Sequence, residues 1–292
     1  MKIATFNIDG KRKVGVLDDD SATIAPFNLT TEQAAQGIQS LIEWQLAGNE
    51  LPATGAPIAL DSVVIEAPLP RPRRNVFCVG KNYYDHAHEF SSSGFDSSAA
   101  QGAVPEYPII FSKVPESVIG SGDLIEYDPA VSSAIDYEVE LAIIIGKPGR
   151  GISRENALDH IWGYTIINDV TARDLQGRYS QWLVGKSQDS FCPMGPVAVT
   201  RDAINLGDTR LRTWVNEELR QDSNTSLMIF DVPTIIQTIA EGVTLLPGDV
   251  IATGTPAGVG IGFKPPKYLA EGDRVCCEID GIGRLENRLS RR

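Results

Sequence analysis

The sequence lacks an apolar run as long as a membrane-spanning helix needs, which is about 18 to 20 residues. It begins Met1-Lys-Ile-Ala-Thr-Phe-Asn7 and turns polar at once, without the apolar core of a signal peptide. Cysteine is scarce, and none of the four cysteines forms a C-x-x-C pair, which argues against a disulfide framework and against a zinc site. We therefore expect a cytoplasmic protein without a membrane partner.

Dense runs of basic residues are also absent, and the formal net charge is -12. A chain this acidic repels a phosphate backbone, which excludes nucleic acid as a partner. Gly185-Lys186-Ser187 ends like a P-loop, but Ser180 stands where that motif needs a glycine. Residues 253–262 have the spacing G-x-G-x-G, not the G-x-G-x-x-G of dinucleotide folds, although the backbone N–H groups of such a loop can approach an anionic oxygen.

The remaining composition is that of a globular protein. The chain has 292 residues, of which 42% are apolar and 22% charged, enough for one large domain and a small one. Residues 2–8 and 13–17 alternate around Asp9-Gly10 and predict a hairpin, and residues 31–47 carry apolar positions at helical spacing. Three prolines between Pro68 and Pro72 mark a stiff connector. We predict a small N-terminal α+β domain over residues 1–66 and a working domain over 67–292.

The second part is rich in strand signals and poor in helices. Helices are predicted over residues 154–160, 172–179 and 233–241, the last with Asp231 as its N-cap. Because helices do not alternate regularly with strands, the pattern favours a mixed, rolled sheet in an α+β fold that is mainly β. The predicted strands are residues 75–79, 107–111, 124–127, 137–145, 164–169, 197–200, 211–215, 250–253 and 274–279.

Two glutamates interrupt an apolar run in a way that indicates a metal ion. Glu138 and Glu140 are two residues apart, so in a strand they point to the same face, whose next residues are apolar. Such a pair either takes up a proton at a raised pKa or binds a cation, and a hard divalent ion such as Mg²⁺ or Mn²⁺ suits carboxylate oxygens. Asp169, at the end of a second apolar run, supplies a third oxygen. The alternative is an edge strand whose acids face water.

Two of the three histidines lie in one short segment with a glutamate. If this segment is helical, His86 and Glu89 are three residues apart on one face, and the carboxylate orients the imidazole as a general base. A polar surface turn is the alternative. His88 falls off that face, and His160 is interpreted as structural.

A further polar cluster follows Asp169. Arg173 and Gln176 share a helical face, where a guanidinium can bind a substrate carboxylate or a ligating acid and an amide can position water. Arg173 can equally be a structural partner of groups near Asp174. Lys186 lies among apolar and small residues and needs an anionic partner if it is buried.

The segment after the histidines is rich in serine, glycine and alanine. A loop of this composition beside a catalytic group is typical of active-site lids, and it is also typical of ordinary surface loops. We expect a lid over Phe90 to Gly102 that influences substrate choice.

Five motifs, in order and at matching spacing over residues 68–289, resemble the fumarylacetoacetate hydrolase superfamily. Among its members, the chain is most similar in pattern to the shorter acylpyruvate hydrolase and isomerase-like proteins, because no additional acidic ligand stands between Arg74 and Lys81. The motifs are Gly80-Lys-Asn82-Tyr83-Tyr-Asp-His86, Asp136-Tyr-Glu138-Val-Glu140, Asn168-Asp169-Val-Thr-Ala-Arg173-Asp174, Gly185-Lys186-Ser187 and Leu246-Pro-Gly-Asp249-Val-Ile-Ala-Thr-Gly-Thr255-Pro.

This resemblance implies a mixed β-roll, usually a homodimer, with a variable small N-terminal domain. It implies that Mg²⁺ or Mn²⁺ is held by three acids and that a lid carries a histidine–glutamate dyad. It further implies that several polar residues contact a small 2-oxo acid substrate or the catalytic water. The residues concerned are Glu138, Glu140 and Asp169 for the metal, His86 and Glu89 for the dyad, and Arg173, Gln176, Lys186 and Thr255 for the substrate and water.

The activity implied is hydrolysis of the C3–C4 bond of an acylpyruvate-type 2,4-dioxo acid to pyruvate and a carboxylic acid. His86 would deprotonate the attacking water, and Lys186 with Gln176 would position it. The same site can serve oxaloacetate decarboxylation, isomerisation of a 2-hydroxy-dienedioate or ureidoglycolate lyase chemistry. A metal-stabilised binding protein without turnover is a further alternative.

Overall fold

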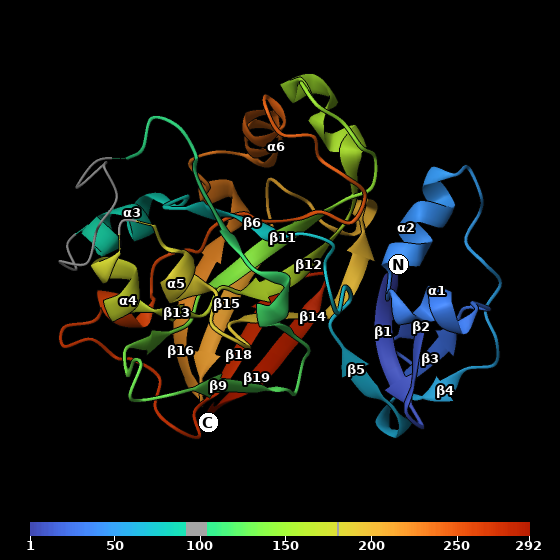
Figure 1. Ribbon diagram of the computed structural model, residues 1–292, viewed down its shortest axis with the longest axis horizontal. Coiled ribbons are helices and arrows are strands. Elements are labelled where there is room, and N and C mark those ends of the chain that lie inside the picture. The colour runs from blue at the N-terminus through green and yellow to red at the C-terminus, as the bar shows by residue number, and fades with distance from the viewer. Residues whose placement is uncertain (92–103, 180) are drawn as a thin grey trace.

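The computed structural model describes residues 1–91, 104–179 and 181–292, and it is mainly β with mixed sheets, as the sequence predicts (Figure 1). Within these residues, none of the helices combines the length and hydrophobicity that crossing a lipid bilayer requires. The N-terminal elements lie at one end of the molecule, and the helices near the acidic motifs lie at the other (Figure 1).

One large mixed sheet runs through the molecule. Its middle contains β11 and β12, the strands that carry the acidic motifs, and every residue of β11 is buried. A strand buried on both faces reads as a continuous apolar run, which is how residues 141–145, after Glu140, appear in the sequence. The order of the path is β4 (Ile58–Ala59), β3 (Thr23–Pro26), β2 (Lys11–Asp18), β1 (Lys2–Ile8), β14 (Cys192–Thr200), β12 (Ile161–Asn168), β11 (Val139–Ile145), β17 (Val250–Ala252), β6 (Val76–Gly80) and β7 (Ile109–Lys113), with β5 (Val64–Glu66) beside β1 and β8 (Val118–Ile119) beside β14.

A second sheet packs against this one, and the main core lies between them. Leu141 and Ile143 of β11 meet Leu211 and Ile279 of the second sheet in this core. A smaller apolar cluster covers the other face of β11, where Ala142 and Ile144 lie. The strand order of the second sheet is β16 (Glu218–Asn224), β15 (Arg210–Val215), β18 (Arg274–Ile279), β19 (Gly283–Arg291) and β9 (Leu124–Tyr127), and a separate short pair joins β10 (Ile135–Asp136) to β13 (Thr171–Ala172).

The N-terminal hairpin is present, but the helix predicted over residues 31–47 is wrong as one element. Asp9 and Gly10 both have positive φ angles, 51° and 75°, which suits the two-residue turn between β1 and β2. The helix is divided into α1 (Thr31–Ala35) and α2 (Gln39–Leu46), because Gly37 has a φ of +63° and a Cβ there would lie 2.5 Å from the Pro68 carbonyl oxygen. The domain boundary near residue 66 stays a prediction.

The other predicted helices are found with small shifts. The predicted ones are α4 (Arg173–Arg178) and α6 (Val232–Ala240), and the histidine segment, whose helicity the sequence left open, forms α3 (Tyr84–Ser91). The short helix α5 (Leu183–Lys186) was not predicted. Asp231 caps α6 by accepting from Thr234 N at 3.0 Å, as predicted. Residues Arg154–His160 form a 3₁₀ helix instead of the expected α-helix, and shorter 3₁₀ turns occur at Leu60–Ser62, Pro115–Ser117, Arg201–Ala203, Thr225–Leu227 and Gly260–Gly262.

All nine predicted strands are found, β9 and β18 with the predicted boundaries and the others with shifted ones, but sequence analysis missed several strands, of which β16 and β19 are the longest. Both are polar, and their buried faces carry amides among the apolar residues. Gln221 of β16 and Asn287 of β19 are buried, and both side-chain amides form hydrogen bonds. In β19 the alternation of Leu285, Asn287 and Leu289 toward the core was the available signal.

Candidate functional site

Three carboxylates converge where β11 and β12 end side by side. Glu140 lies in β11, Glu138 precedes that strand, and Asp169 follows the last residue of β12. Two hydrogen bonds fix the junction: Asp169 N donates to the Glu138 carbonyl at 2.8 Å, and Glu138 N donates to Asn168 Oδ1 at 2.9 Å. One oxygen from each acid lies within 4.8 Å of the others, and all three side chains are buried. The spacing in the sequence and the pairing of two strands therefore produce one acidic cluster.

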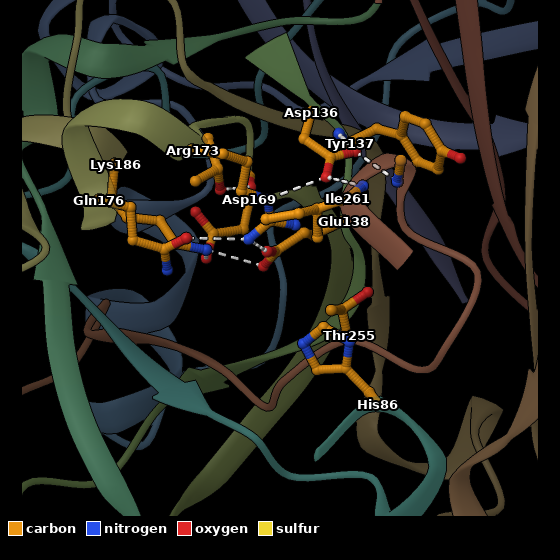
Figure 2. Close-up of polar contacts among 12 residues, drawn as sticks. His86, Asp136, Tyr137, Glu138, Asp169, Arg173, Gln176, Lys186, Thr255 and Ile261 are labelled. Atoms are coloured by element: carbon orange, nitrogen blue, oxygen red, sulfur yellow. Dashed lines mark hydrogen bonds and ion pairs between the residues drawn. The ribbon is translucent and has the colours of Figure 1, made fainter. Parts of the chain in front are cut away.

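Two buried cations bind these acids. Lys186, from α5, donates from Nζ to Glu138 Oε2 and to Asp169 Oδ2, both at 2.8 Å (Figure 2). Arg173, the first residue of α4, contacts Glu138 Oε1 through Nη1 at 2.7 Å. The sequence predicts that a buried Lys186 needs an anionic partner, and it gives a ligating acid as one possible partner of Arg173. In the structure both side chains form ion pairs with acids of the cluster.

Sequence analysis missed a third buried cation, Lys113 at the end of β7. Its Nζ donates to Asp169 Oδ1 at 2.6 Å and to the Val170 carbonyl at 3.1 Å, and it also contacts the Lys186 carbonyl. The side chain has no exposed surface. Lys113 therefore joins one acid of the cluster to the backbone of the helix that carries Lys186.

We expect Lys113→Met to lower the free energy of unfolding by about 3 to 5 kcal/mol, the usual cost of removing one partner from a buried ion pair. Denaturant unfolding of the purified variant measures this loss. Lys267→Met is the matched control, because Lys267 forms a half-exposed ion pair and should change stability by less than about 1 kcal/mol. A Lys113 variant as stable as the control would contradict the importance of this buried contact.

Burial and charge separate the two glutamates. Burial alone would raise the pKa of Glu138, but Lys186 and Arg173 outweigh it and lower that pKa from 4.5 to about 2. For Glu140, burial and the negative charges of Asp169 and Glu138 all raise the pKa well above 4.5. Glu140 also accepts a hydrogen bond from Gly254 N at 2.8 Å, which offsets little of this. Glu138 is therefore ionised, whereas burial and the neighbouring carboxylates disfavour the charged form of Glu140.

This donor set fits a hard divalent ion. Mg²⁺ and Mn²⁺ prefer carboxylate oxygens, and the three acids bring such oxygens close enough together to share one ion. The opposed charge of Glu140 is a second sign of fit, because a cation would relieve it. Within the set of contacting groups, the carboxylates of Asp136, Glu138, Glu140 and Asp169 outnumber by one the cations Lys113, Arg173 and Lys186. The choice between the two metals stays a prediction.

The histidine segment forms the helix α3, and this brings His86 and Glu89 into contact. His86 Nδ1 lies 3.3 Å from Glu89 Oε2, and His86 is almost fully buried. Glu89 in turn accepts from Gly258 N at 3.0 and 3.2 Å. His88 is exposed on the same helix, and His160 contacts the Lys147 carbonyl at 2.8 Å, far along the chain from this site.

A small cavity, with about 20 Å³ open to the centre of a water molecule, lies between the acids and the histidine. Arg173 Nη2 is buried at its wall and, within residues 1–91, 104–179 and 181–292, has no hydrogen-bond partner. Thr255 Oγ1 accepts from Gln221 Nε2 at 2.8 Å, and Gln176 Oε1 accepts from Arg173 Nη1 at 3.1 Å. Most of the predicted site residues line the cavity, namely His86, Glu138, Glu140, Arg173, Gln176, Lys186 and Thr255, while Glu89 and Asp169 lie directly behind them. Their roles stay predictions.

Residues that hold the site in place were harder to find from the sequence than those that line it. Asp136 accepts from Arg173 Nε at 2.8 Å, and Gln221 joins Val139 N to the Thr255 hydroxyl. Asp136 stands two residues before Glu138, so the local acidic pattern was a usable signal. Gln221 stands alone in a polar strand and gave none. Nearly all of the predicted lid, residues 92–102, lies outside the described residues.

Residues 75–290 match the family model described as the fumarylacetoacetate (FAA) hydrolase C-terminal domain. Among curated proteins, the chain is 43% identical over 309 aligned residues to the oxaloacetate tautomerase YisK of Bacillus subtilis, covering 99% of this chain and 100% of that protein. It is 43% identical to the human mitochondrial oxaloacetate tautomerase FAHD2A, covering 78% of this chain and 69% of that one.

Solved structures that are similar to this chain also match it over its whole length. A fumarylacetoacetate hydrolase from Exiguobacterium antarcticum superposes with a TM-score of 0.84 at 44% identity, covering 100% of both chains. A 5-carboxymethyl-2-hydroxymuconate delta-isomerase from Mycobacterium smegmatis superposes with a TM-score of 0.79 at 32% identity, again covering 100% of both. The relatives thus include proteins described as tautomerases, hydrolases and isomerases.

Proposed function

The chain belongs to the fumarylacetoacetate hydrolase family, and we propose that it interconverts the keto and enol forms of oxaloacetate. The observation that carries this proposal is Arg173 Nη2, a buried guanidinium nitrogen at the wall of the cavity that has no hydrogen-bond partner among the described residues. Such a group needs a hydrogen-bond acceptor, and the carboxylate of a small 2-oxo acid supplies a charge-assisted one. The Bacillus subtilis relative, which aligns over the full chain, supports oxaloacetate as that acid.

The cluster of acids provides the second argument. A divalent ion held by Glu138, Glu140 and Asp169 would act as a Lewis acid on the 2-oxo group. It would also turn the net charge of the contacting carboxylates and cations from negative to positive, which favours an anionic substrate. The cavity is small, and its wall combines Glu138 and Glu140 with Arg173 and Lys186. A compact acid with several oxygens suits this lining.

Tautomerisation moves a proton from C3 of the substrate to the oxygen on C2. His86 Nδ1 is held by Glu89, so its Nε2 is the nitrogen that accepts the C3 proton. Lys186 donates a hydrogen bond to the C2 oxygen as negative charge develops there. Burial opposes the charge of Lys186, but Asp169 and Glu138 outweigh it and raise its pKa above 10.5, so its ammonium stays protonated and does not act as a base. The C3–H bond breaks as the C2–C3 double bond forms and the C2=O double bond becomes a single bond; the C2 oxygen then takes a proton from solvent, and His86 releases the C3 proton to solvent.

Hydrolysis of an acylpyruvate is the second candidate, and the contact between His86 and Glu89 favours it. A histidine oriented by a carboxylate can deprotonate water for attack on the C4 carbonyl, after which the C3–C4 bond breaks and C3 takes up a proton. Arg173 would bind the same carboxylate in either reaction. The two candidates share the site and differ in whether His86 acts on a carbon-bound proton or on water.

A panel of substrates with Mg²⁺ or Mn²⁺ separates the candidates. Loss of the ultraviolet absorbance of enol-oxaloacetate reports tautomerisation, and pyruvate release reports cleavage of a 2,4-dioxo acid. We expect metal-dependent tautomerisation that chelation by EDTA removes and that re-addition restores. Faster pyruvate release from a 2,4-dioxo acid would make hydrolysis the function, and inactivity on the whole panel would contradict both.

A further inference from the structure

The glycine loop, residues 258–262, lies between the two halves of the site. The sequence predicts that the backbone N–H groups of this region can approach an anionic oxygen. The structure supplies two such anions, and both are side chains of this chain: Glu89 of the dyad and Asp136 beside Arg173. The loop therefore contacts both the group that orients the histidine and the group that orients the arginine.

At one end, the loop binds the carboxylate of Glu89. Gly258 N donates to both carboxylate oxygens, at 3.0 and 3.2 Å. Glu89 Oε1 occupies the space beside Gly262, where an added Cβ would lie only 1.9 Å from it. Glu89 can reach His86 in this position only because residue 262 has no side chain.

At the other end, the loop is anchored on Asp136 (Figure 2), whose side chain is fully buried. Gly260 N donates to Asp136 Oδ1 at 2.7 Å, and Ile261 N donates to Oδ2 at 2.9 Å. The same Oδ2 accepts from Arg173 Nε at 2.8 Å, and Oδ1 accepts from Tyr137 N at 2.9 Å. One carboxylate thus fixes both the loop and the guanidinium.

Apolar packing fixes the loop to α3. Val259 and Ile261 form a buried cluster with Phe90, which follows Glu89 on the helix, and with Trp182. The residues of the loop therefore alternate: the glycines face carboxylates, and the two apolar residues face the helix. A displacement of the loop would carry the end of α3 with it.

We propose that Asp136 is a positioning residue that sets two features of the site at once: the orientation of Arg173 Nη2 toward the cavity and, through the glycine loop, the contact between Glu89 and His86. This inference rests on the proposed function where it assigns substrate to Arg173 and His86. The mechanical link between Asp136 and α3 stands apart from it.

Two substitutions test the two ends. Asp136→Asn preserves shape, but its amide cannot accept all four hydrogen bonds, so either the loop or Arg173 must move. Gly262→Ala displaces Glu89 and leaves the anchor on Asp136 intact. Matched controls are Asp61→Asn, at an exposed position, and Gly242→Ala, where an added Cβ meets nothing within 4 Å.

Hydrogen exchange tests the link without any reference to activity. In Asp136→Asn we expect faster amide exchange in the peptide 256–263 and also in the peptide 84–91, which contains α3. Gly260→Ala is the second variant in case Asp136→Asn does not fold, since its Cβ would lie 2.7 Å from Asp136 Oδ1 and push the loop off its anchor. Unchanged exchange in the peptide 84–91 in the folded variants would overturn the proposal.

Oxalate binding and kinetics test the consequence for the site. With Mn²⁺ present, Asp136→Asn should bind oxalate about 10- to 100-fold more weakly, because a charge-assisted hydrogen bond to Arg173 is lost. It should also lose kcat, because the loop no longer holds Glu89 against His86. Gly262→Ala should lose kcat about 100-fold while oxalate binding changes less than about twofold. In the double variant, the loss of kcat should be close to that of Gly262→Ala alone, because both changes act on one dyad.

If the two losses of kcat multiply in the double variant, the two substitutions act on kcat independently, and the proposal that both act through the Glu89–His86 dyad is overturned. A wild-type protein that neither binds oxalate nor acts on any substrate of the panel would instead remove the proposed function, and the exchange measurement would still decide whether Asp136 holds α3.

Discussion

Glu140→Gln is expected to stabilise the protein in EDTA and, at the same time, to abolish its metal-dependent activity. Glu140 is buried, and burial, Asp169 and Glu138 all oppose its charge. Glutamine keeps the shape, can accept from Gly254 N as Glu140 Oε2 does, and offers an N–H to the neighbouring carboxylates. It removes one of the three acids that the ion requires, so activity should fall by about 10³-fold or more.

The pH dependence follows from the direction of the pKa shift. The pKa of Glu140 lies well above its ordinary value of 4.5, so above that value the folded protein binds a proton that the unfolded chain releases. Stability in EDTA therefore falls as the pH rises from about 4.5 through the raised pKa of the folded state. Glutamine does not titrate, so the advantage of the variant should be absent below pH 4.5 and grow with pH above it.

Thermal unfolding measures both effects. In EDTA at neutral pH the variant should unfold at a higher temperature than the wild type; with saturating Mn²⁺ the order should reverse, because a ligand stabilises only the protein that binds it. Glu50→Gln, at an exposed position, is the control. A variant that is less stable in EDTA, or one that keeps its Mn²⁺-dependent stabilisation, would contradict the reading of Glu140 as a metal ligand.

His86→Ala is expected to lower tautomerisation and any acylpyruvate cleavage by about 10²- to 10⁴-fold, while Mn²⁺ affinity is retained. The histidine lines the cavity opposite the acids and contributes no carboxylate to them. Lys186 should not replace it as a base, because the acids raise the pKa of Lys186 and keep its ammonium protonated. Steady-state rates on both substrates and calorimetric Mn²⁺ titration give the two readouts.

His88→Ala is the matched control for this prediction, since His88 lies on the same helix with its side chain exposed. Unchanged turnover in His86→Ala would refute the role given to it in both reactions. Loss of cleavage with tautomerisation intact would instead assign the carbon proton to another base and leave His86 as the base for water.

The lining of the site could be predicted because local rules place it. A spacing of two residues aligns Glu138 with Glu140 in an extended segment, and a spacing of three aligns His86 with Glu89 on a helix. Each rule needs only the immediate neighbours in the sequence. The long-range meeting of these segments came from the family resemblance and not from either rule.

The supporting residues could not be predicted in the same way. Lys113 was assigned to no site because its partner Asp169 is 56 residues away, and a lysine at the end of an apolar strand normally reaches water. Gln221 lies 34 residues from Thr255, in a strand whose polarity hid it. The helix over residues 31–47 failed for a related reason, since the break at Gly37 is imposed by contact with Pro68.

The pairing of β1 with β14 determines how this protein can be shortened. Lys2 and Ile3 lie opposite Val199 and Ala198, so the first strand of the chain completes the hydrogen bonding of a strand that itself neighbours β12. Deletion of residues 1–66 would leave these backbone groups of β14 unpaired on a buried, apolar stretch, and exposed edges of that kind associate with one another. A truncated protein should accordingly be isolated as aggregates, even though every residue lining the cavity is still present.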